Sequence, residues 1–167
     1  MSLNTILLPK RIIADLYKNN LVELETTAPV LKSEKLESQF KFLGENKKKI
    51  LIAVKYPDVV YLPDDQLGFL TNLLRVCKLD LSDVAVLNFQ HYSGKDFSNI
   101  LFYFEPKTIF LFGLSPEELG LPLLFPPFQV QVFKETVYLY SPALEKIEQD
   151  KILKSKLWVC FKKIFGL

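Results

Sequence analysis

The only histidine, His91, is the side chain best suited to general acid–base chemistry near neutral pH. It follows an apolar run that predicts a buried strand, and open α/β sheets bind ligands at the carboxyl ends of their parallel strands. Its position suits a catalytic histidine or an ordinary loop histidine at a strand end, and the sequence favours the second. The residue types allow a Ser-His-Asp assembly, but no nucleophile-elbow sequence is present.

Metal and phosphate sites have no recognisable motif. The two cysteines, Cys77 and Cys160, lack partners at metal-ligand spacing and lie in apolar helical patterns, which favours two buried free thiols. The six glycines form neither GxGxxG nor a P-loop. Gly113 ends an apolar run, where it permits a tight turn or, alternatively, lets a backbone amide face a ligand. We therefore assign no catalytic residue, metal or cofactor.

Positive charge is concentrated near the C-terminus. Residues 146–167 contain six lysines and two acidic residues, a net charge of +4, whereas the whole chain carries only +2. A helix of this kind faces either nucleic acid or an acidic partner, or it is a solvated face opposite an apolar stripe. The small net charge excludes a histone-like binder, so we expect weak or indirect DNA contact at most.

The elements that would position these residues alternate between strand and helix. Three continuous apolar runs predict strands that are covered on both faces, at 50–54, 84–89 and 108–113. Helical patterns at 64–77 and 96–104 separate them, which predicts right-handed βαβ units. Residues 128–133 alternate apolar and polar and predict an edge strand, followed by an extended piece at 136–140. We expect a three-layer α/β/α fold with a mostly parallel central sheet of four to five strands.

Short polar signals predict where helices begin. Asp64 or Asp65 is expected to cap the first helix of the body. Ser141-Pro142 has the pattern of an N-cap followed by proline in the first turn. Asp150 is expected to open the last helix, whose apolar stripe includes Trp158.

Length and composition indicate one globular domain with an N-terminal extension. The chain has 167 residues, and its hydrophobic content of 49% with 14 Phe excludes wholesale disorder. We expect an amphipathic segment at 1–25, a connector at 26–48 that is helical around 33–43, and an α/β body with a C-terminal helix at 49–167. Pro9 interrupts the first apolar patch too early for a signal peptide, and no run is long enough to span a bilayer. These features predict a cytoplasmic protein.

Two segments near the C-terminus carry a family resemblance. Tyr-Ser-Pro-Ala-Leu-Glu at 140–145 is followed by Lys-Ser-Lys-Leu-Trp at 154–158, and earlier a strand pattern at 49–54 precedes a leucine-rich helix at 67–74. Over roughly residues 48–165 the chain resembles the psi subunit of bacterial DNA polymerase III, the small protein associated with the clamp loader. The resemblance implies a non-catalytic adaptor with a three-layer α/β body.

The resemblance also implies partners. In psi-like proteins the body pairs with the chi subunit, which contacts single-stranded-DNA-binding protein, and a flexible N-terminal segment docks on the clamp-loader collar. An amphipathic segment on a tether suits that role because its apolar face fits a partner groove. The partner-binding residues that we expect are Ile6, Leu7, Leu8, Ile12, Ile13, Leu16, Tyr17 and Trp158.

The psi fold is similar in topology to uracil-DNA glycosylases, and this likeness defines the alternative function. A glycosylase-like enzyme or nucleotide-binding domain would need a polar pocket at the strand ends, near Tyr56, Asp58, His91 and Gly113. Asp58 would activate water and Tyr56 would stack on a flipped base. The full glycosylase motif is absent, and no histidine occurs late in the chain.

Overall fold

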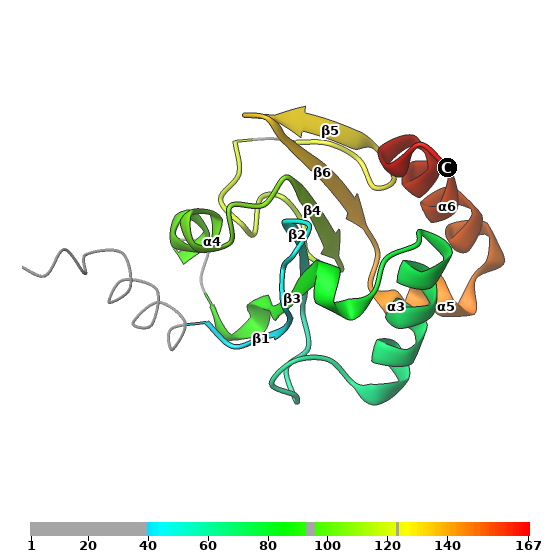
Figure 1. The fold of residues 1–167 in the computed structure, drawn as a ribbon, viewed down its shortest axis with the longest axis horizontal. Helices are drawn as coiled ribbons and strands as arrows, with labels where there is room; N and C mark the ends of the chain where they lie inside the picture. The colour runs from blue at the N-terminus through cyan, green and yellow to red at the C-terminus, as the bar shows by residue number, and fades with distance from the viewer. Residues whose placement is uncertain (1–39, 93–95, 123) are drawn as a thin grey trace, which may run out of the picture. The chain divides into compact units, whose positions relative to one another are not determined.

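The computed structural model describes residues 40–92, 96–122 and 124–167. Over this range the chain forms a mixed α/β structure around one six-stranded sheet, with strand order β1-β3-β2-β4-β6-β5 (Figure 1). Four central strands run parallel to one another: β3 (Val84–Asn88), β2 (Ile50–Val54), β4 (Thr108–Phe112) and β6 (Thr136–Ser141). The edge strands β1 (Phe42–Gly44) and β5 (Val130–Phe133) are antiparallel to their neighbours.

The strand pattern corrects the expected sheet in two respects. The sheet has six strands and is mixed, where a mostly parallel sheet of four to five was predicted. One reason is the two-residue turn at Lys134 and Glu135, whose φ angles of 46° and 64° suit a tight hairpin, so β5 and β6 must pair antiparallel. The other is β1, which lies inside the predicted connector and overlaps the end of its expected helix at 33–43, but pairs with β3 as a strand.

Four α-helices are described: α3 (Asp64–Val76), α4 (Phe97–Phe104), α5 (Leu144–Gln149) and α6 (Lys151–Phe165). The expected helix starts are partly wrong. Pro63 is the N-cap of α3, and Asp64 and Asp65 lie in the first turn instead. Ser141 is the last residue of β6, so Ala143 precedes α5.

Asp150 caps α6 as predicted. Its Oδ1 accepts hydrogen bonds from the backbone N–H groups of Ile152 at 2.7 Å and Leu153 at 3.3 Å. These bonds satisfy two of the amides that the first turn of a helix leaves without intrahelical partners.

Two apolar clusters lie against the sheet, and they use alternate residues of each strand. In β2, Ile50, Ile52 and Val54 join the cluster that includes α3, α5 and α6, whereas Leu51 and Ala53 join the cluster that includes α4. Figure 1 shows α4 apart from the other three helices. Because side chains along a strand alternate between faces, a strand with both sets buried reads as a continuous apolar run.

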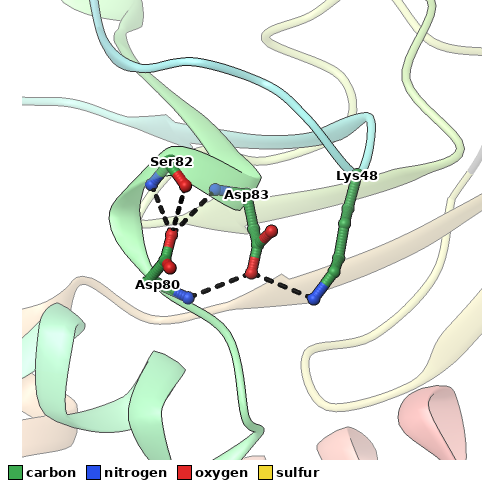
Figure 2. A network of polar contacts seen from close by, with 4 residues as sticks. All are labelled: Lys48, Asp80, Ser82 and Asp83. Carbon is green, nitrogen blue, oxygen red and sulfur yellow. Dashed lines mark hydrogen bonds and ion pairs between the residues drawn. The ribbon is translucent and has the colours of Figure 1, made fainter.

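A polar network fixes the start of β3. A 3₁₀ turn, η2 (Leu81–Asp83), precedes the strand, and Asp80 caps it by accepting bonds from the backbone N–H groups of Ser82 at 2.8 Å and Asp83 at 3.3 Å. Asp83 Oδ2 accepts from the Asp80 N–H at 3.1 Å and from Lys48 Nζ at 3.0 Å, which ties the loop before β2 to the same turn (Figure 2). The Ser82 hydroxyl bond is the first cause that lowers the pKa of Asp80.

None of the helices that the structure describes is both long enough and apolar enough to cross a membrane.

Candidate functional site

The carboxyl ends of β2, β3, β4 and β6 form the edge where an α/β sheet would bind a ligand. One residue at this edge is buried and polar: Asn88, the last residue of β3, is only 1% exposed. Its Nδ2 donates to the carbonyl oxygens of Tyr56 and Val59, both at 2.7 Å. Its Oδ1 accepts from the backbone N–H groups of Tyr56 at 3.1 Å and Gln90 at 3.2 Å. All four bonds go to the chain's own backbone, and three of them fix the loop after β2 to the end of β3.

Tyr56 belongs to this loop, and its side chain is buried. Its side chain belongs to the cluster around α3, α5 and α6, and its hydroxyl has no hydrogen-bond partner among the described residues. Burial is the main cause that raises the pKa of Tyr56, and the carboxylates of Glu145 and Glu148 on α5 raise it further. A ring held inside the apolar cluster is not exposed for stacking on a base.

Asp58 and His91 lie at the surface. Asp58 is exposed, and its carboxylate makes no hydrogen bond or ion pair within the described part of the chain. His91 is exposed too, at the end of the 3₁₀ turn η3 (Phe89–His91), and its Nε2 lies 3.0 Å from the carbonyl oxygen of Val59. His91 and Asn88 therefore contact the same carbonyl group, and both support the loop that contains Tyr56 and Asp58.

Gly113 follows β4 and meets a different part of the chain. Its φ angle of 69° lies in the left-handed region, as expected for a tight turn out of a buried strand. Its N–H donates to the carbonyl oxygen of Ser141 at 2.9 Å, so the amide is paired with the end of β6 and does not face a ligand. A Cβ at this position would lie 3.0 Å from the Cβ of Ala143.

Two hollows are described in the body, and none of Tyr56, Asp58, His91 and Gly113 lines either one. The first, about 270 Å³, lies at the carboxyl edge and is lined by Lys55, Phe89, Gln90, Tyr92, Leu114 and Glu118. The second, about 360 Å³, lies between α4 and the β5–β6 hairpin.

The charges at the first hollow neutralise each other. Lys55 Nζ lies 2.5 Å from Glu118 Oε1, and this bond is the first cause that lowers the pKa of Glu118. Glu118 Oε2 also accepts from the N–H of Ser115 at 2.8 Å. A carboxylate held in its ionised form by two donors is a poor general base, because it has little tendency to take up a proton.

Trp158 lies half-buried on α6, where it packs against the apolar cluster, and Lys162 Nζ lies 5.5 Å from its ring centroid. The other seven expected partner-binding residues, from Ile6 to Tyr17, lie outside the described residues. Cys77 and Cys160 are buried free cysteines, as predicted.

Asn88 is the residue at this edge whose role the sequence did not reveal. A lone amide side chain at the end of an otherwise apolar run was the signal that could have identified it. A polar group that ends a fully buried strand must find hydrogen bonds, because an unsatisfied buried amide is costly.

Among the described residues, no three His, Cys, Asp or Glu side chains come together as a metal site would need. Comparison with known proteins gives no assignment: no protein-family model matches the sequence, and no curated protein matches it.

Proposed function

We propose that this chain is a non-catalytic adaptor of the psi type, which links the clamp loader of a bacterial replicative DNA polymerase to a chi-like partner that binds single-stranded-DNA-binding protein. The observation that carries the proposal is the use of the carboxyl edge for internal support. The side-chain amide of Asn88 makes three hydrogen bonds to the loop after β2 and a fourth to Gln90, and the N–H of Gly113 donates to the carbonyl oxygen of Ser141. An edge occupied in this way favours a scaffold over an enzyme.

Residues of the two segments that carry the family resemblance are packed into the body. Ser141 is 1% exposed at the end of β6, and Leu144 at the start of α5 is fully buried. Trp158 packs on the same apolar cluster from α6. Residues that join a central strand to two helices maintain the body itself, which supports the psi-like three-layer arrangement together with the clusters on both sides of the sheet.

The glycosylase-like alternative receives no support from the four residues that define it. Tyr56 is buried, the N–H of Gly113 is bonded to Ser141, and Asp58 lies at the surface with no described group to orient it. Water activation needs a positioned carboxylate beside a substrate pocket. We therefore propose that the cell uses this chain for binding, and that it acts in the cytoplasm.

The partner assignment is tested with the full chain. Ile13→Asp combined with Leu16→Asp should abolish capture of a purified clamp-loader complex, because both residues are expected to lie on the apolar face of the N-terminal segment. Binding to a chi-like protein should persist, since the body is unchanged. Asn19→Asp combined with Asn20→Asp adds the same charge beside that face and serves as the control. Equal capture by both variants would contradict the proposed role of the segment.

A further inference from the structure

The outer face of α6 combines aliphatic side chains with lysines that have no ion-pair partner among the described residues. Ile152 is 66% exposed and Val159 is 63% exposed, although most β-branched side chains of this size are buried in folded domains. They are seven residues apart, so they lie on one side of the helix about 10 Å from each other. Of the buried residues of α6, Leu157 and Phe161 lie on its opposite side, and Cys160 lies about a quarter of a turn from the stripe.

Lysines flank this stripe on both sides. The helix contains five lysines and no acidic residue, and all five are exposed: Lys151, Lys154, Lys156, Lys162 and Lys163. In a helical projection Lys156 and Lys163 fall on one side of the Ile152–Val159 stripe, and Lys151 and Lys162 fall on the other. None of the ion pairs that the structure describes involves any of the five.

The helix dipole accounts for only part of this charge. Lys162 and Lys163 lie in the last turn, where positive charge stabilises a helix. Lys151 and Lys154 lie in the first turn and a half, where positive charge opposes the dipole. Lys154 has a contact within the body, because it lies near the Phe69 ring of α3, but no such contact is described for Lys151. An anionic partner would give the charge of Lys151 a stabilising role.

The aromatic side chains on and near α6 help to distinguish two possible anionic partners, single-stranded nucleic acid and an acidic protein segment. Single-stranded nucleic acid binds through phosphates and through bases stacked on exposed aromatic rings. Here Lys162 Nζ lies 5.5 Å from the Trp158 ring centroid, and Lys154 Nζ lies 5.6 Å from that of Phe69 on α3. Lysine ammonium groups thus occupy positions that stacked bases would need, while the most exposed apolar groups on the helix are aliphatic.

We propose that the Ile152–Val159 stripe of α6 docks an acidic amphipathic helix of a partner protein. The partner would place apolar residues at heptad-like spacing against Ile152 and Val159, with glutamate or aspartate on both flanks facing the lysines. This stripe is separate from the N-terminal segment, so the inference stands whether or not the chain belongs to a polymerase.

The test uses two fluorescein-labelled three-heptad peptides and the full chain. Both peptides carry leucine at the a and d positions; one has glutamate at e and g, and the other has lysine there. We expect the glutamate peptide to bind with an affinity that falls as salt rises, and at least about tenfold more tightly than the lysine peptide. A labelled thymidine oligonucleotide is the third probe and should bind more weakly than the glutamate peptide.

Two double variants separate the contribution of the lysines to peptide binding from that of the aliphatic side chains. Lys156→Glu with Lys163→Glu, and Ile152→Ser with Val159→Ser, should each weaken binding of the glutamate peptide by about tenfold. Lys41→Glu with Lys107→Glu makes the same charge change elsewhere on the body and should have little effect. Because the stripe is exposed, circular dichroism should show unchanged folding. If the serine variant unfolds early, Ile152→Thr with Val159→Thr takes its place.

Three results would overturn the proposal. One is equal affinity for the glutamate and lysine peptides, which would make α6 a plain solvated face. Another is binding of the glutamate peptide that depends on the lysines but not on Ile152 and Val159. The third is tighter binding of the oligonucleotide through the same lysines, which would make the face a nucleic-acid surface.

Discussion

The side-chain amide of Asn88 forms two hydrogen bonds with the backbone of Tyr56: its Oδ1 accepts from the Tyr56 N–H at 3.1 Å, and its Nδ2 donates to the Tyr56 carbonyl oxygen at 2.7 Å. The two residues are separated by 32 positions in the chain and join the end of β3 to the loop after β2. This contact forms a structural joint between the ends of two neighbouring strands, at the edge where α/β sheets usually bind ligands.

Asn88→Ala should therefore destabilise the body strongly. The change removes four hydrogen bonds and leaves the buried backbone N–H and carbonyl groups of Tyr56 without the Asn88 side chain as a partner, so we expect a loss of about 3 kcal/mol in the free energy of unfolding. Urea denaturation measures this value. Gln90→Ala, at an exposed neighbour, should change stability by less than about 0.5 kcal/mol. A similar small change for both variants would show that the joint is dispensable.

Two glycine substitutions should shift stability in opposite directions. Gly113→Ala places a Cβ 3.0 Å from Ala143 at a residue whose φ angle is 69°, and we expect a loss of about 1–2 kcal/mol. Gly68→Ala is its control, because Gly68 lies in α3 with open space around it, and alanine there should add about 0.5–1 kcal/mol. Thermal melts of the two variants test the pair. Equal stability of Gly113→Ala and the parent would mean that the turn is not held as described.

The buried thiols should make stability fall at alkaline pH. Burial raises the pKa of Cys77 from 9.0 to about 11 and also raises that of Cys160. The unfolded chain then loses its thiol protons at lower pH than the folded chain, so the stabilisation is complete below pH 9 and declines toward pH 11. Urea midpoints of the parent and Cys77→Ala, measured between about pH 8 and about pH 10, should converge as pH rises. Parallel curves would contradict the raised pKa.

The network around Asp80 predicts a loss of stability in acid. Hydrogen bonds from Ser82 are the leading causes that lower the pKa of Asp80 below its usual 3.8. The folded carboxylate binds its proton at lower pH than the unfolded one, so its stabilisation is present above about pH 4 and disappears as pH falls through the folded pKa. Asp80→Asn should lower the melting temperature at neutral pH. In acid, the difference in melting temperature between this variant and the parent should become smaller. Asp58→Asn, at an exposed carboxylate with no partner among the described residues, should leave the melting curve unchanged throughout.

The sequence predicted the elements that carry strong local patterns. The strands β2, β3 and β4 stand out because burial on both faces produces uninterrupted apolar runs, and α6 stands out because Asp150 precedes an apolar stripe. In each case the signal lies within a few neighbouring residues.

Features that depend on distant partners could not be predicted in the same way. The three residues of β1 carry no pattern of their own, and only pairing with β3 makes them a strand. The four candidate pocket residues are similar: Tyr56, Asp58, His91 and Gly113 do follow the strand ends, but none of them lines either of the two hollows described in the body. The position of the loop after β2 depends on Asn88, whose partners in that loop lie about thirty positions earlier in the chain.

Light scattering coupled to size-exclusion chromatography tests the adaptor proposal most directly. The full chain is mixed with a purified bacterial clamp loader and a chi-like protein, and the mass of each eluting species is measured. We predict a single species whose mass includes all three components, and loss of the chi-like protein from it when the chain is left out. Separate elution of the chain at its own mass would contradict the proposed function.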